Sequence, residues 1–266
     1  TGMLTSAVVF ISVTMIGGMW SASLSNILNV SLKYIGIILA TIVSVTHVGG
    51  LANLEAQLPK NVPFLSFFDG VGIIGIMTWM IVLVTVNLSL QSIIQISLGA
   101  KDVQTARRGF IIGGLMMLPI GFVSALLGVI ARTMFPDVSP AMALPMTIMS
   151  LNPFLAGITL AALWAADVST ACSLLLSSAT LFSQDIYKKF VDPTVSEKKF
   201  LVVTKSSVLI LGLLTLFLAM TISCIINTLM VGLSLTASFS VIILFTLFAP
   251  SQKKKNAAFY TIITSL

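Results

Sequence analysis

One helical face within residues 159–187 carries small and hydroxylated side chains at intervals of three or four residues. Its members are Ala162, Ala166, Ser169, Thr170, Ser173 and Ser177. The adjacent hydroxyls of Ser169 and Thr170, with the carbonyl of Ala166 one turn earlier, supply three oxygens. A hard cation such as sodium needs several oxygens in place of its water, and unwound backbone elsewhere would add the rest. The face therefore predicts a cation site, unless its small residues serve only the close packing of helices.

Two charged side chains, Lys33 and Asp167, lie inside long apolar runs. They fall about 11 and about 14 residues into predicted helices, which is near mid-membrane at ~1.5 Å per residue. A charge there costs roughly 2.5–3.5 kcal/mol on insertion scales. Because the two depths match, one interpretation is an ion pair beside the cation site. The other is that each charge snorkels to the interface or pairs with a different group.

The rest of the chain is suited to a lipid bilayer. Apolar residues make up 57% of it and charged residues 8%, which is too apolar for a water-soluble globule. Stretches of about 20 apolar residues, the length that spans ~30 Å of hydrocarbon, recur throughout. The sequence predicts an all-α polytopic membrane protein, with residues 1–266 in a single transmembrane helical bundle. Cys172 and Cys224 lie in apolar runs, which indicates core residues and not a disulfide.

Apolar runs and breaks predict seven helices and the beginning of an eighth. Their ranges are about 3–20, 22–46, 70–97, 109–131, 153–183, 201–223 and 227–249, with a stub at 256–266. Gly17 and Gly18 end the first helix. The third helix turns polar in its second half, which indicates either a segment that lines a cavity or an early exit into the headgroup layer.

Basic residues are concentrated in every second loop. The loops 99–109, 184–200 and 250–256 hold most of the Lys and Arg residues. The positive-inside rule places these three loops in the cytoplasm and the loops 50–68 and 133–150 outside. The first helix then runs from outside to inside. This asymmetry accounts for the net charge of +6 without a nucleic-acid partner.

Three segments carry motifs of a known family. They are AADVSTACSLLLSSATLFSQDIY at 165–187, GGMWSASLSNILN at 17–29 and QSIIQISLGAKDVQTARRG at 91–109. In these motifs, in order, the chain resembles the sodium:solute symporters. The resemblance implies a LeuT-type inverted-repeat helical bundle, of which this fragment would contain core helices four to ten and the start of a further helix. The first three core helices would be missing from it.

The resemblance also implies a distribution of sites. Sodium, the coupling ion, would bind Ala166, Ser169 and Thr170, and no organic cofactor is expected. The solute would face Leu83, Val86, Asn87 and Gln91, where the absence of large aromatic residues favours an amino acid or a carboxylate over a sugar. A second cation region is predicted at Asn26, Cys172 and Ser173. The chain departs from the family motifs at Asn26, Asn29 and Ile96, where the family has Asp, Gln and Arg.

The predicted function is sodium-coupled symport of a small organic solute by alternating access, in a multi-pass protein of the cell membrane (plasma or inner). One alternative keeps the fold but is proton-coupled or sodium-independent, with the Lys33 ammonium in place of sodium. A second is a non-transporting sensor of the same fold. An intramembrane enzyme is disfavoured, because Asp167 alone makes no aspartyl dyad and no Gly-x-Ser nucleophile pairs with His47.

Overall fold

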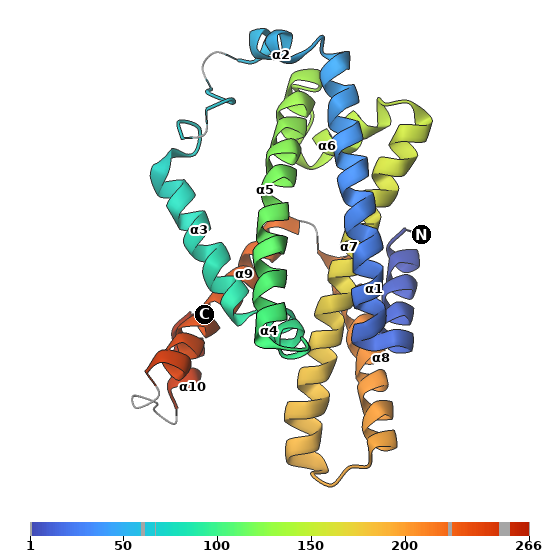
Figure 1. Ribbon diagram of the computed structural model, residues 1–266, viewed down its shortest axis with the longest axis vertical. Coiled ribbons are helices and arrows are strands. Elements are labelled where there is room, and N and C mark those ends of the chain that lie inside the picture. The colour runs from blue at the N-terminus through green and yellow to red at the C-terminus, as the bar shows by residue number, and fades with distance from the viewer. Residues whose placement is uncertain (1, 60–61, 67, 223–224, 250–255, 266) are drawn as a thin grey trace. The chain divides into compact units, whose positions relative to one another are not determined.

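The computed structural model describes residues 2–59, 62–66, 68–222, 225–249 and 256–265 (Figure 1). Within these ranges the regular structure is helical, with no strand. Cys224 and the basic cluster at 253–255 lie outside the described residues. The described chain therefore has the all-α class that its composition predicts.

Six helical segments of the described residues are long and apolar enough to cross a membrane. They are α1 (Gly2–His47), α3 (Gly72–Ser89), α5 (Val103–Met134), α7 (Pro153–Leu181) with the π-helix η1 (Phe182–Val191), α8 (Glu197–Thr221) and α9 (Ile225–Phe248). Many of their large apolar side chains are exposed, among them Ile74 at 80% and Phe217 at 65%. Surfaces this apolar are stable against lipid and not against water. The prediction of an all-α polytopic membrane protein is confirmed.

The first of these segments contains two of the predicted helices. Gly18 interrupts α1 with φ 52° and ψ −139°, a conformation that L side chains rarely adopt. The chain turns back there, so that residues 19–47 run away from the turn in the direction opposite to residues 12–17 (Figure 1). The sequence analysis places the break at the same glycine pair.

Short helices fill the connections. α2 (Leu51–Gln57) and α6 (Pro140–Met149) lie in the two loops predicted to be external, and α10 (Ala257–Ser265) follows α9. Pro140 occupies the first turn of α6, where its missing N–H costs nothing. α5 begins at Asp102, whose carboxylate accepts the Thr105 N–H at 2.7 Å.

The predicted third helix is two helices in the structure. α3 ends at Ser89 and α4 (Gln91–Leu98) begins after Leu90, which has an extended backbone with φ −70° and ψ 114°. No Gly or Pro marks this position. The single helix predicted over 70–97 is therefore wrong at this position.

The chain divides into two compact units. One contains 12–70 and 101–173, and its apolar cores join α1 and α2 to α5 and to the start of α7. The other contains 1–11, 71–100 and 174–266, in which α3 and α10 pack against α9, and η1 packs against α8. The candidate cation residues belong to the first unit and the candidate solute residues to the second.

Candidate functional site

The three oxygens predicted to bind sodium lie together on one turn of α7. The carbonyl oxygen of Ala166 accepts the Ser169 hydroxyl at 2.9 Å and the Thr170 hydroxyl at 3.1 Å. Ser169 is half-buried and Thr170 is exposed. Each hydroxyl is free to rotate its proton away and present a lone pair to a cation instead. Three oxygens do not complete a sodium shell, so further donors are required.

Helix packing accounts for the first part of the same face. Thr159 and Ala162 are almost fully buried. The Thr159 hydroxyl lies 3.3 Å from the carbonyl oxygen of Gly36 on α1. Exposure increases from Ala162 to Ser169 and Thr170. Both interpretations therefore apply to this face. Its first part, around Thr159 and Ala162, packs closely against α1, and its next one to two turns carry accessible oxygens.

The proposed second cation region contains an unpartnered buried oxygen. Asn26 Oδ1 is buried and accepts no hydrogen bond. Ser173 donates its hydroxyl to the Ser169 carbonyl at 3.0 Å, and a side-chain hydrogen bond joins Cys172 to Thr14. The structure thus places Ser173 next to Ser169, whereas the Cys172 side chain is hydrogen-bonded to α1.

Packing between α1 and α7 gives the level of Asn26. Gly36 lies beside Thr159, and Ala40 packs with Leu155 and Ala156, so the two helices are antiparallel here. Asn26 precedes Gly36 by the same number of residues by which Ser169 follows Thr159. If the register continues, Asn26 lies at the height of Ser169.

The Lys33–Asp167 ion pair is not present in the structure. Within the described residues, the salt bridge with N···O at or below 4.0 Å joins Lys199 to Asp192. The α1–α7 register sets Lys33 near Ala162, which is five residues or ~7.5 Å in height from Asp167. Asp167 also follows Ala166 directly, which turns it about 100° away from the packed face. Residue counting from the helix ends could not resolve this offset.

The candidate solute residues lie at the end of α3. Val86 is buried at 6%, whereas Leu83 and Asn87 are exposed and Gln91 is half-buried. Asn87 Nδ2 donates to the Leu83 carbonyl at 2.7 Å. The break at Leu90 separates Gln91, which begins α4, from the other three. Asn87 and Gln91 therefore flank an interruption, which is where membrane helices expose backbone groups to a ligand.

The polar residues of this segment have partners that the sequence analysis missed. Ser89 donates to the Thr236 carbonyl of α9 at 2.7 Å, and Ser240 donates to the Thr85 carbonyl of α3. Gln95 Nε2 lies 3.3 Å from the Thr180 hydroxyl. The sequence predicted that this segment either lines a cavity or exits into the headgroup layer. Neither prediction includes these hydrogen bonds between helices. The repeated spacing Thr-x-x-x-Ser in both α3 and α9 was the available signal.

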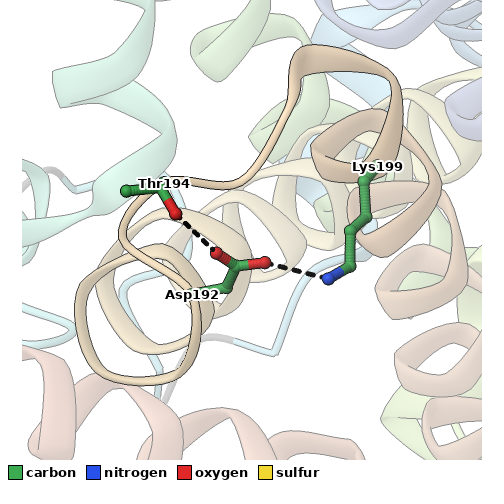
Figure 2. Close-up of polar contacts among 3 residues, drawn as sticks. All are labelled: Asp192, Thr194 and Lys199. Carbon is green, nitrogen blue, oxygen red and sulfur yellow. Dashed lines mark hydrogen bonds and ion pairs between the residues drawn. The ribbon is translucent and has the colours of Figure 1, made fainter.

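A polar cluster closes the connection between η1 and α8, in a loop predicted to be cytoplasmic. The Lys199 ammonium lies 2.9 Å from Asp192 Oδ2, and the Thr194 hydroxyl lies 3.4 Å from Oδ1 (Figure 2). The hydrogen bond from Lys199 holds the pKa of Asp192 below its ordinary value of 3.8. The Lys188 ammonium lies 5.6 Å from the centre of the Phe200 ring. These contacts join the two helices at their shared end.

The fold is that of a multi-pass helical membrane protein. It has a cluster of candidate cation-binding oxygens on α7 and a helix break between α3 and α4 that is flanked by polar residues. The model of the sodium:solute symporter family matches residues 1–264, and the chain belongs to that family.

Several curated proteins are similar to the chain. The osmoregulated proline transporter OpuE of Bacillus subtilis (strain 168) is 26% identical over 233 residues, which cover 82% of this chain and 45% of the relative. The sodium/glucose cotransporter of Vibrio parahaemolyticus is 30% identical over 161 residues, 54% of this chain and 28% of the relative. The high-affinity choline transporter 1 of Caenorhabditis elegans is 25% identical over 246 residues, 83% of this chain and 41% of the relative.

The chain spans less than half the length of these relatives. All three are named as transporters, in agreement with the prediction that the protein is not an enzyme.

Proposed function

We propose that the complete protein is a sodium-coupled symporter of a small organic solute, such as an amino acid or a carboxylate, in the cell membrane. The observation that carries the proposal is the grouping of the Ala166 carbonyl with the Ser169 and Thr170 hydroxyls on one turn of α7. Membership of the sodium:solute symporter family supports sodium as the ion.

Coupling would follow from the order of binding. Sodium replaces the two hydroxyl-to-carbonyl hydrogen bonds with contacts to three oxygens, together with donors from other parts of the protein. Its charge then stabilises the conformation in which those donors converge. A solute that binds the same conformation is bound more tightly when sodium is present, and sodium likewise when the solute is present. Alternating access then carries both inward.

The interrupted helix supports the solute site. Asn87 and Gln91 lie on either side of Leu90, where amide side chains and freed backbone groups can bind a polar solute. L-Proline is the first solute to test, because OpuE, the proline transporter, aligns with 82% of this chain.

The test is uptake of labelled L-proline by the complete protein in vesicles, measured against sodium concentration. Replacing both Ser169 and Thr170 with Ala should raise the sodium concentration for half-maximal uptake at least about tenfold, because contacts to a charged group contribute roughly 1.5–3 kcal/mol each. Uptake at saturating sodium should change less. The control is Thr215→Ala in α8, which removes a hydroxyl that bonds only its own helix. An unchanged sodium dependence in the double variant would assign this face to helix packing alone.

A second candidate is a transporter of the same fold that is coupled to protons. Lys33 favours it, since the described part of the structure gives this half-buried ammonium no ion pair. Uptake that follows a pH gradient, ignores sodium and loses its pH response in Lys33→Ala would select this candidate. Uptake that vanishes in choline buffer at every pH would reject it.

A further inference from the structure

Two serines form a reciprocal contact between α3 and α9. The Ser89 hydroxyl lies 2.7 Å from the Thr236 carbonyl oxygen, and the Ser240 hydroxyl bonds the Thr85 carbonyl oxygen. The two hydroxyl oxygens are 3.0 Å apart. Each serine thus reaches the carbonyl that lies four residues before the other serine.

Each hydroxyl of the pair has one proton to donate. The shortest contact of Ser89 is to the Thr236 carbonyl at 2.7 Å, and the Thr85 and Val86 carbonyls of its own helix lie 3.3 Å and 3.2 Å away. Ser240 donates either to Thr85 or to Ser89. Ser240 is completely buried, at 0% exposure. Outside water, a hydroxyl without a partner is costly, and the partners of the Ser240 hydroxyl lie on the other helix, α3. The two helices are therefore joined at this level by more than apolar contact.

The contact lies at the last residue of α3. Ser89 is directly followed by Leu90, where the helix breaks, and Asn87 is in the same turn. A helix end next to a break has fewer backbone hydrogen bonds than a helix interior and frays more readily unless something holds it. Here that support comes from α9.

We propose that Ser89 and Ser240 are positioning residues, a serine clasp that fixes the last turn of α3 on α9 and so sets where Asn87 lies at the break. The inference deepens the proposed solute site and rests on it for its functional meaning. The clasp itself is a property of the helices and does not depend on which ion or solute is transported.

The experiment measures how often the end of α3 is released. In the complete protein with its native cysteines replaced, Asn87→Cys is labelled with N-ethylmaleimide without sodium or solute. Hydrogen bonds between membrane helices contribute about 0.6–1.7 kcal/mol, so Ser240→Ala should accelerate labelling about 3- to 18-fold. Ser89→Ala, at a half-buried position, should do the same. The double variant removes both bonds between the helices, so it should label at least as fast as either single variant.

Two variants separate a clasp from a general loss of stability. Ser89→Thr keeps the hydroxyl and should restore the slow rate. Ser207→Ala in α8 removes another buried hydroxyl, which bonds the Val203 carbonyl of its own helix, and should leave labelling unchanged. Labelling rates within about twofold of the parent in both Ser89→Ala and Ser240→Ala, or an equal acceleration in Ser207→Ala, would overturn the clasp. Since labelling requires no transport, sodium-independent uptake would overturn the proposed function and leave this result standing.

Discussion

Gly36 of α1 and Ala162 of α7 meet with no room for another side-chain atom between them. A β-carbon added to Gly36 would lie 2.7 Å from the β-carbon of Ala162 and 3.3 Å from the Cα of Thr159. Real β-carbons do not approach so closely, and Thr159 contributes backbone that cannot rotate away. This contact sets the register between α1 and the helix that carries Ala166, Ser169 and Thr170.

Gly36→Ala should therefore destabilise the complete protein by about 1–3 kcal/mol, the usual cost of overpacking a close contact. Thermal unfolding in detergent measures the change. Gly128→Ala in α5 is the control, because a β-carbon there meets nothing within 4 Å. Adding Ala162→Gly should recover part of the loss. Equal stability of Gly36→Ala and Gly128→Ala would mean that the two helices are not in contact here.

Lys33 and Asp167 should behave as independent charges. Because no ion pair joins them in the structure, the effects of Lys33→Met and Asp167→Asn on the free energy of unfolding should add within about 0.5 kcal/mol. A double-mutant cycle on the complete protein measures the coupling. A coupling energy well above that range would restore the ion pair that the sequence predicted.

The membrane topology remains a prediction from the positive-inside rule. Single cysteines at Ser66 and Ser196, in the complete protein without its native cysteines, test it in intact cells. An impermeant maleimide should label position 66 from outside and reach position 196 only after the cells are opened. Ser66 and Ser196 both lie in connections between helices, so helix burial does not shield them. Labelling of position 196 from outside would reverse the orientation.

The Asp192–Lys199 contact should make the η1–α8 connection sensitive to acid. The pKa of Asp192 is lowered in the folded protein, so its stabilisation is complete above the ordinary value of 3.8 and is lost as the pH falls through the lowered pKa. The parent should therefore show an acid-dependent loss of stability below about pH 4 that Asp192→Asn lacks.

The check is thermal unfolding of the parent and of Asp192→Asn between pH 3 and pH 7. Both side chains reach solvent, so 1 M NaCl, with a Debye length of ~3 Å, should shrink the difference between the two proteins. A difference that persists in salt, or that shrinks toward neutral pH, would contradict the assignment.

Hydropathy and motif spacing predicted much of this molecule. The apolar runs located the membrane-crossing helices, and the glycine pair at 17–18 located the first break, because lipid requires long apolar helices and left-handed backbone requires glycine. The Ser169–Thr170 dipeptide and Ala166 also lie together, since positions three and four apart on a helix are neighbours.

What the sequence could not provide was contact between helices. The break at Leu90 has no Gly or Pro, and the helix end there is held by Ser240, which is 151 positions from Ser89 in the chain. The offset between Lys33 and Asp167 depends on where Gly36 meets α7, which no local pattern encodes. Ser139 before Pro140 was a readable start signal for α6, and a closer reading would have found that helix.

The turn at Gly18 has a consequence for biosynthesis. Residues 17–29 contain no Lys or Arg, so the insertion machinery meets no positive charge at this reversal that it could retain in the cytoplasm. Two apolar helices joined by a single glycine leave the ribosome in immediate succession, with no polar loop between them that could be translocated separately. They should enter the bilayer as one hairpin.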